Sequence, residues 1–211
     1  KSMINLMKKP LWKMAIDRPD LAGQVLKFAK GAGIKKTMDL VKSRLDVWHL
    51  LGYSSSGIVV KVGKNVTNYS VGDQVACIGS GFANHAEYIS VPKNLISKIP
   101  KNVNLKDAAF SGIACIALQS IRQINPQLGE TIVVIGLGLI GQMVAQMLRA
   151  NGCKVIGIDL DKSKTAKGYV DEGITKDTVK NVLNVTDNIG ADGVIIAADT
   201  KHNLINDSFD M

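Results

Sequence analysis

The 211-residue sequence has few cysteines and no long apolar run, and each shortage excludes a class of protein. Its three cysteines, Cys77, Cys115 and Cys153, are far apart and odd in number, which argues against a disulfide framework and a C-x-x-C metal site. No apolar stretch is long enough to span a bilayer, and the first residues lack the basic-then-apolar order of a signal peptide. We therefore expect a cytoplasmic protein without a transmembrane segment, whose cysteines are reduced and buried.

Acidic side chains are too few to balance the basic ones, and the imbalance is local. The formal net charge is +8. Residues 1–50 hold 11 basic and 4 acidic side chains, whereas the other 161 residues hold 15 and 14. The basic segment suits a solvated helical face or a surface for an acidic partner. Aromatic residues do not accompany it, so a nucleic acid is disfavoured as a partner.

The first half of the chain changes its hydrophobic period near residue 51. Residues 10–46 have apolar side chains at helical spacing and predict two amphipathic helices, broken at Gly31 and Gly33. Short segments interrupted by Gly, Asn and Pro follow, and they predict a small β-barrel or sandwich, with a buried helix from Leu105. The strands are expected at 56–63, 71–79, 85–92 and 96–100.

The last part of the chain alternates strands and helices. Strands are expected at 131–136, 154–158 and 192–198, and helices at 139–150 and 177–188. The strands are apolar throughout, which predicts a parallel sheet covered on both faces. The domains are therefore expected to be a helical pair at 1–50, a barrel domain at 51–122 and a truncated parallel-sheet domain at 123–211.

A G-x-G-x-x-G sequence lies where the first of these strands meets its helix, which is its place in a dinucleotide-binding fold. Gly136 allows a tight turn, Gly138 lets the backbone approach a pyrophosphate, and Gly141 lets the helix pack close to the strand. The helix N-terminus supplies free N–H groups for the phosphates. The predicted cofactor loop also includes Leu137, Leu139 and Ile140.

The second apolar strand ends at Asp159, 18 residues after Gly141. A carboxylate at this position can accept hydrogen bonds from both hydroxyls of the adenosine ribose, and it would repel a 2′-phosphate. Leu160, rather than an Arg, follows it. These residues predict NAD in preference to NADP, and Lys162 and Lys164 keep NADP open as an alternative.

Four motifs follow one another in a fixed order, and together they indicate a family. They are "LGYSSSGIVVKVGKNVTNYSVGDQVA", "HAEYISVP", "AAFSGIACIAL" and "LGETIVVIGLGLIG". The order resembles the medium-chain dehydrogenase/reductase superfamily, which includes zinc alcohol dehydrogenases and quinone reductases. The resemblance covers most of residues 51–198. It implies an α/β fold with a GroES-like β-barrel domain before a Rossmann doubly wound sheet. It also implies an enzyme that transfers hydride between NAD(P) and a small substrate with an alcohol, a carbonyl or an activated double bond.

The sequence departs from the zinc-dependent members at the expected ligand positions. These members have Gly-His-Glu where this chain has Gly52-Tyr53-Ser54. The position of a second ligand, a Cys, falls at Ile113, and no Cys precedes Cys77. The four-cysteine structural lobe is absent as well. Because zinc needs three or four converging ligands, the resemblance implies a zinc-independent member without a bound metal.

The helical pair indicates a narrower resemblance. The pattern "RPDLAGQVL…KTMDLVKSRLD…LGYSSSGIV" is similar to bacterial two-domain oxidoreductases, in which a zinc-free medium-chain part precedes a second dehydrogenase-like domain. The similarity implies that both domains are incomplete, that the chain is fused to a second domain and that the substrate is related to sugars. Superfamily members often form homo-oligomers. Residues 162–176 are shorter and more polar than expected, so either residues are missing or the sheet is locally degraded.

Hydride transfer without zinc still needs groups that polarise the carbonyl and handle the proton. Tyr53 stands where the family places a metal ligand, so the resemblance puts it near the nicotinamide, where Ser54 could orient it. Ser111 precedes the buried helix and is a further catalytic candidate. Ala197 and Ala198 end the last strand and would leave room for the nicotinamide ribose.

Two alternatives stay open on the residues alone. Tyr53 could merely fill the space that the metal vacates. The whole chain could also be a regulatory or structural module that binds a dinucleotide while the chemistry takes place in another domain.

Overall fold

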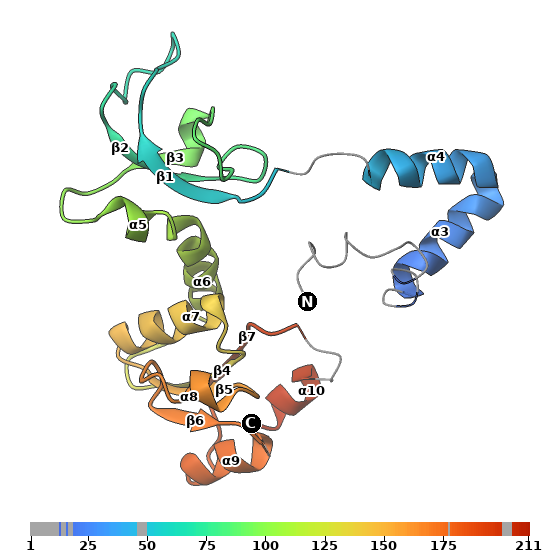
Figure 1. Cartoon of the computed structure of the whole chain (residues 1–211). Coiled ribbons are helices and arrows are strands. Elements are labelled where there is room, and N and C mark those ends of the chain that lie inside the picture. Colours follow the sequence, from blue (N-terminus) through green and yellow to red (C-terminus); the bar gives the residue numbers. More distant parts are fainter. Residues whose placement is uncertain (1–12, 14–15, 17–18, 46–49, 177, 200–203) are drawn as a thin grey trace. The chain divides into compact units, whose positions relative to one another are not determined.

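Two compact units make up the chain, residues 1–50 and residues 51–211. The structure is a computed structural model (Figure 1). It describes residues 13, 16, 19–45, 50–176, 178–199 and 204–211. Asp17, a residue type that commonly caps helices, and the histidines His49 and His202 lie outside the described residues. Within the described part, no helix has the length and apolar character that crossing a membrane requires.

The first unit contains the two predicted helices. They are α3 (Pro19–Ala32) and α4 (Ile34–Leu45). Gly33 separates them with a φ of +87°, a conformation that side-chain-bearing residues rarely adopt. The buried Thr37 donates its hydroxyl to the Gly33 carbonyl at 2.8 Å, which fixes the start of α4. The predicted helix break is confirmed at Gly33, whereas the break predicted at Gly31 is wrong, because Gly31 lies within α3.

The second unit begins with a three-stranded antiparallel sheet in the order β1-β2-β3. The strands are β1 (Ser54–Ile58), β2 (Gln74–Ile78) and β3 (Ile96–Lys98). Val75, Cys77 and Ala83 form its buried core. Ser54 lies opposite Ile78 in the register, so the start of β1 is placed at the end of the sheet from which the chain leaves β2.

The prediction of a strand at 85–92 is wrong, because no residue of that segment belongs to a strand. The alternating pattern nevertheless identifies the side chains that face the core, because Ile89 and Val91 are half-buried against it. However, the sheet consists of β1, β2 and β3, and the segment does not pair with any of these strands. A 3₁₀ turn, η1 (Lys93–Leu95), connects it to β3.

Two helices lead from the barrel part to the parallel sheet. The sequence predicts one helix from Leu105, but the structure has α5 (Leu105–Ala108) and α6 (Ser111–Ile124). The side chain of Asn104 caps α5 by accepting the Asp107 N–H at 2.9 Å. Helix α6 packs against β1 and β2 on one side and against the next helix on the other.

The rest of the unit is the predicted parallel sheet, in the order β6-β5-β4-β7. The strands are β4 (Thr131–Ile135), β5 (Lys154–Ile158), β6 (Glu172–Ile174) and β7 (Gly193–Ile196). The helices are α7 (Leu139–Ala150), α8 (Lys162–Thr165), α9 (Thr178–Val185) and α10 (Leu204–Phe209). The short α8 and β6 occupy the segment that the sequence marked as unusually short and polar.

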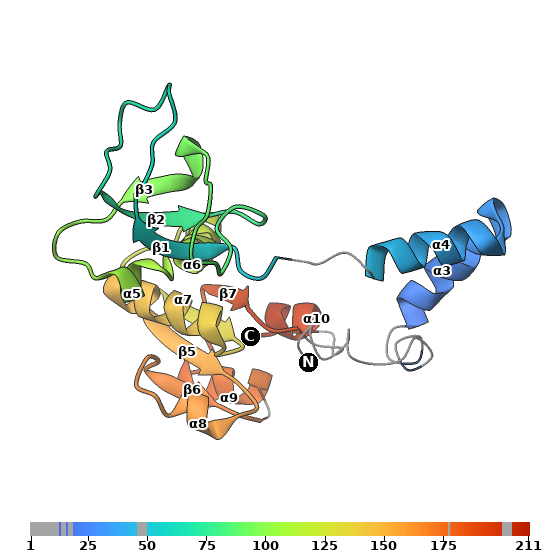
Figure 2. The ribbon, with the colours of Figure 1, turned by 45° about the horizontal axis from the view of Figure 1, so that its top comes forward.

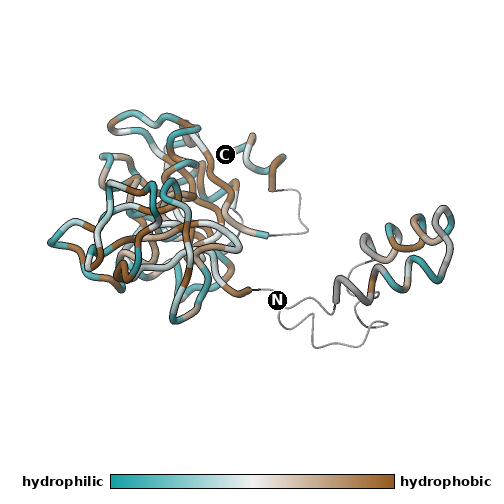
Figure 3. Tube along the Cα trace, turned by 90° about the horizontal axis from the view of Figure 1, so that it is seen from above, coloured by the Kyte–Doolittle hydropathy of each residue, from teal (hydrophilic) through white to brown (hydrophobic). Residues whose placement is uncertain are grey.

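Helices cover both faces of this sheet, as Figures 1 and 2 show. Ile132 and Val134 of β4 face α6 and α7, whereas Val133 and Ile135 face α9 and α10. The alternation sends neighbouring residues of β4 into two apolar cores, which is why the strand is apolar throughout. In Figure 3 the apolar colour accordingly runs through the interior of residues 51–211. The strand order reverses between β4 and β7, where such sheets bind ligands.

Candidate functional site

The glycine loop begins where β4 ends and lies against the end of β7. Gly136 has a φ of +91°. A Cβ added there would lie 2.8 Å from the Cβ of Ala198 and 3.0 Å from the carbonyl carbon of Ala197. Only glycine fits this turn. The structure therefore brings three predicted cofactor residues, Gly136, Ala197 and Ala198, together at the carboxyl ends of neighbouring strands.

The other two glycines of the motif differ in what surrounds them. A Cβ on Gly141 would overlap the carbonyl oxygen of Gly136, so α7 packs directly on the loop. Gly138 is the N-cap of α7 and has extended backbone angles, φ −69° and ψ −167°. Apart from Gly138 itself and its two chain neighbours, no residue has an atom within 4 Å of the position that its Cβ would take. The open space at Gly138 lets a ligand approach the backbone and the N–H groups of the first turn of α7, which have no partner inside the helix.

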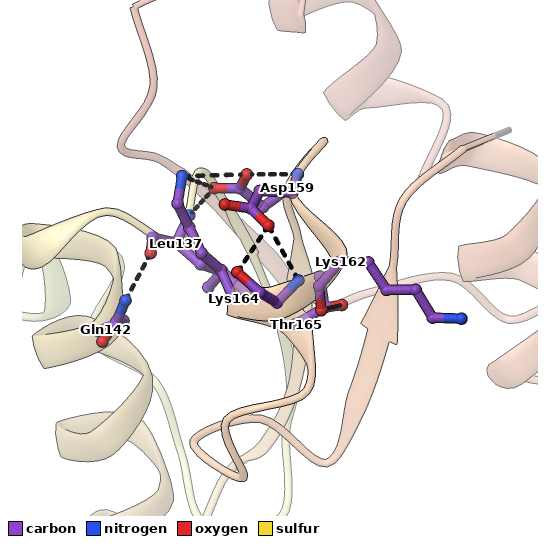
Figure 4. A network of polar contacts seen from close by, with 8 residues as sticks. Leu137, Gln142, Asp159, Lys162, Lys164 and Thr165 are labelled. Carbon is purple, nitrogen blue, oxygen red and sulfur yellow. Dashed lines mark hydrogen bonds and ion pairs between the residues drawn. The ribbon is translucent and has the colours of Figure 1, made fainter.

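The middle of the loop is held rigidly by a residue that the sequence did not single out. The Gln142 side chain donates an N–H to the carbonyl oxygen of Leu137 at 2.8 Å (Figure 4). The Leu137 side chain is buried in the core between α7 and the sheet. The only sequence signal for Gln142 is that it is a polar residue in an otherwise apolar first turn of α7.

Asp159 ties the same loop to the end of β5. Its Oδ2 accepts the N–H of Leu137 at 2.8 Å, and its Oδ1 accepts the N–H of Asp161 at 2.9 Å. The Lys164 ammonium lies 3.2 Å from Oδ2 and 3.3 Å from Oδ1. Figure 4 shows Leu137 and Lys164 converging on the carboxylate. The ion pair with Lys164 is a contact that the sequence alone did not predict.

The charge of Asp159 follows from these contacts. Burial raises the pKa of this carboxyl, but the N–H groups of Asp161 and Leu137 and the Lys164 ammonium outweigh burial. The net result is a pKa below the ordinary value of 3.8. Only 11% of the side chain is exposed. Asp159 is thus an ionised, nearly buried acceptor at the tip of β5.

The remaining predicted cofactor residues differ in burial. Ile140 is half-buried and packs against the core beneath α7. Leu139 is half exposed at the start of α7, and Leu160 is 93% exposed. Ile140 therefore supports the loop from below. Leu139 and Leu160 present apolar surface from which a bound ligand could exclude water.

Of the three catalytic candidates, Ser54 has its hydroxyl committed within the fold. It is buried at the start of β1, donates to the carbonyl oxygen of Ala109 at 2.6 Å and accepts the N–H of Gly112 at 3.1 Å. It joins β1 to the start of α6. Tyr53, directly before it, is 45% exposed, and its carbonyl oxygen accepts the N–H of Gly79 at 2.9 Å.

Ser111 lines a cavity of about 460 Å³ between the sheet strands β2 and β3 and helix α6. Cys115, one turn further along α6, lines the same cavity. No hydrogen bond between described residues joins Tyr53 or Ser111 to the glycine loop. The structure thus brings the predicted cofactor residues together and leaves the predicted catalytic residues in the barrel part.

His85 is a polar neighbour of the Tyr53 segment that the sequence treated only as a strand start. Its imidazole ring fills the space beside Gly52 that a side chain would need, and the backbone N–H of His85 donates to the carbonyl oxygen of Leu51 at 2.7 Å. Across the described ranges, no three His, Cys, Asp or Glu side chains converge closely enough to hold a metal ion.

Two family models match the chain in the predicted order. The alcohol dehydrogenase GroES-like domain matches residues 17–101. The NAD binding domain of D-isomer specific 2-hydroxyacid dehydrogenases matches residues 113–210. The predicted fold, a GroES-like domain followed by a Rossmann-type sheet, is confirmed. The first match begins within the helical unit, upstream of the predicted boundary at residue 50.

Curated relatives include a xylulose reductase and a guloside dehydrogenase. The chain is 30% identical over 187 residues to D-xylulose reductase A of Aspergillus oryzae, covering 71% of this chain and 52% of that protein. It is 35% identical over 111 residues to D-guloside 3-dehydrogenase of Escherichia coli, covering 52% of this chain and 31% of that enzyme. The chain therefore spans about half the length, or less, of these relatives.

Solved structures show the same architecture. A quinone oxidoreductase from Pseudomonas syringae matches with a TM-score of 0.64 and 28% identity, over 76% of this chain and 51% of that one. The alcohol dehydrogenase TADH from Thermus sp. ATN1 matches with a TM-score of 0.71 and 22% identity, over 84% of this chain and 63% of that one. The second match, at this identity, concerns the fold alone.

Proposed function

Because the chain belongs to the medium-chain dehydrogenase/reductase superfamily, we propose that it is part of a nicotinamide-dependent oxidoreductase acting on an alcohol or carbonyl substrate. One observation carries this proposal. The glycine loop, Asp159 and the Ala197–Ala198 pair meet at the carboxyl ends of β4, β5 and β7, where the strand order reverses. The proposed domains are the helical pair at 1–50, the catalytic barrel at 51–122 and the cofactor domain at 123–211.

The cofactor loop has the features that a dinucleotide needs. The unobstructed backbone at Gly138 and the first N–H groups of α7 would hold the pyrophosphate. The ionised Asp159 would accept the ribose hydroxyls, and its negative charge favours NAD over NADP. When bound, the nicotinamide supplies or accepts the hydride. Ala197 and Ala198 pack against Gly136, and their small side chains would leave room at the end of β7 for the nicotinamide ribose.

The proposed substrate is a sugar, a polyol or the corresponding ketone. This proposal comes from the relatives, which are named as a xylulose reductase and a guloside dehydrogenase. The substrate belongs to the catalytic barrel, and the relatives extend well beyond the length matched. Fusion to a second dehydrogenase-like domain, homo-oligomer formation and a cytoplasmic location stay predictions.

We propose that proton handling is zinc-independent and that Tyr53 takes part in it. The side chain of Tyr53 is 45% exposed, whereas the hydroxyl of the neighbouring Ser54 is occupied by Ala109 and Gly112. Tyr53 is therefore the better candidate for donating a hydrogen bond to a substrate oxygen, and Ser54 for positioning it. Ser111, which lines the cavity under α6, is the third candidate.

A module that binds a dinucleotide without chemistry is the alternative. It is favoured by the commitment of the Ser54 hydroxyl to Ala109 and Gly112, which leaves one of the three catalytic candidates without a free hydroxyl for a substrate. Under this alternative, the chain binds NADH but exchanges no hydride with any substrate.

Fluorescence titration with NADH and NADPH tests the binding step. Hydride exchange with a panel of polyols, ketoses and aldehydes, with and without added zinc or chelator, then separates the enzyme from the module. Tyr53→Phe should lower turnover while NADH binding is kept. Tyr88→Phe, at a tyrosine that is 77% exposed, is the matched control and should change neither. Unchanged turnover in Tyr53→Phe removes Tyr53 from the site, and no binding at millimolar concentration refutes both functions.

A further inference from the structure

The carboxylate of Asp159 has no acceptor position to spare. A carboxylate offers about four lone-pair positions, two on each oxygen. Here the N–H of Leu137 and the Lys164 ammonium take Oδ2, and the N–H of Asp161 and the same ammonium take Oδ1. The two backbone contacts are part of the fold. Lys164, on the short helix α8, is the one partner of Asp159 that can leave by a side-chain rotation.

We propose that Lys164 is a specificity-determining residue that narrows the preference of this site for NAD over NADP. The inference rests on the proposed function. An unmodified adenosine ribose needs acceptor positions on Asp159, so its hydroxyls must displace the Lys164 ammonium from the carboxylate. A ribose that carries a 2′-phosphate instead brings its own anion, to which the same ammonium can turn.

Of the charged side chains on α8 and its N-cap, Lys164 is the one placed to contact both the Asp159 carboxylate and a 2′-phosphate. Lys162 lies in the same short helix, but Figure 4 shows its side chain pointing away from Asp159. The Asp161 carboxylate is engaged by Ser163, whose N–H and hydroxyl donate to it at 2.9 Å and 2.7 Å. Lys164 is 35% exposed, so its ammonium can reach a ligand at the surface without breaking the core.

Electrostatics then act on the two cofactors in opposite directions. Displacing Lys164 exposes the full charge of Asp159 and costs the ion pair, which weakens binding of NADH. Keeping Lys164 near the site offsets repulsion between Asp159 and a 2′-phosphate, which strengthens binding of NADPH. The wild-type chain should therefore bind both cofactors, with NADH only moderately preferred.

Titration of the 211-residue protein with NADH and NADPH at low salt tests the proposal, using Lys164→Met and the matched control Lys162→Met. Lys164→Met should weaken NADPH binding about tenfold or more, as expected for loss of one charge-assisted contact. It should leave NADH binding unchanged or tighter. Lys162→Met should change the ratio of the two affinities much less. Competition by 5′-AMP and by 2′,5′-ADP probes the adenosine part of the cofactor alone. Lys164→Met should weaken the binding of 2′,5′-ADP and leave that of 5′-AMP unchanged or tighter.

Several outcomes overturn the proposal, and they are distinguishable. If Lys164→Met weakens NADH and NADPH equally, Lys164 contacts a part that both cofactors share, and only this inference falls. If Lys162→Met alone changes the NADPH affinity, the determinant is Lys162. If neither the wild type nor Lys162→Met binds any dinucleotide, the proposed function fails together with the inference. A thermal melt of each variant shows that a loss of binding is not a loss of folding.

Discussion

Replacing Gly138 with alanine should separate ligand binding from folding. The position has φ −69° and ψ −167°, which alanine adopts without strain, and apart from its two chain neighbours no residue has an atom within 4 Å of the new Cβ. The free energy of unfolding should therefore change by less than about 0.5 kcal/mol. The added methyl group fills the space through which a pyrophosphate would reach the backbone. Losing one or two N–H bonds to a charged phosphate, at about 1.5–3 kcal/mol each, weakens NADH binding at least about tenfold.

The measurements are fluorescence titration with NADH and chemical unfolding of the same samples. Gly141→Ala is the contrasting variant, because its Cβ would overlap the backbone carbonyl of Gly136 and no side-chain rotation relieves that. We expect it to lose stability and binding together, by more than about 3 kcal/mol in unfolding free energy. If Gly138→Ala binds NADH as tightly as the wild type while remaining folded, the pyrophosphate does not approach this glycine, and the reasoning is refuted.

Three further predictions concern stability. Ser54→Ala leaves the carbonyl of Ala109 and the N–H of Gly112 without their partner and should cost about 1–3 kcal/mol in urea unfolding; an unchanged midpoint contradicts this. Gly136→Ala, at φ +91° and against Ala197, should lower the melting temperature more than Gly138→Ala does. Because the pKa of Asp159 is lowered from 3.8, the stability difference between the wild type and Asp159→Asn should be fully present above that value and shrink as the pH falls through the folded pKa. A pH-independent difference argues against this ionised carboxylate.

The local pattern of the sequence was enough to place β4, β5 and β7 of the parallel sheet and the helices α7 and α9, but not β6, α8 or α10. The expected helix at 139–150 and strand at 154–158 agree with α7 and β5 residue for residue. The apolar strands, the glycine motif and the polar turns are local signals, and each specifies its element without help from distant residues. The same holds for the break between α3 and α4 at Gly33.

The barrel part was less predictable, because strands depend on neighbours that the sequence does not reveal. The segment 85–92 alternates as a strand should, yet it pairs with none of the strands β1, β2 and β3. The expected helix from Leu105 is two helices, α5 and α6. No local sequence signal predicts that the Ser54 hydroxyl forms hydrogen bonds with Ala109 and Gly112, which are more than fifty positions away.

The sequence by itself determined the cofactor loop, the order of the two domains and the identity of the acidic residue at the end of β5. These depend on backbone geometry and periodicity, which short stretches of chain encode. Only the tertiary structure decided how those residues are used. It showed that Gly138 alone among the three glycines of the motif faces open space, and that the Asp159 carboxylate is already occupied by Leu137, Asp161 and Lys164. Both facts depend on contacts between residues that are distant in the sequence and come together only when the strands pack side by side in the sheet.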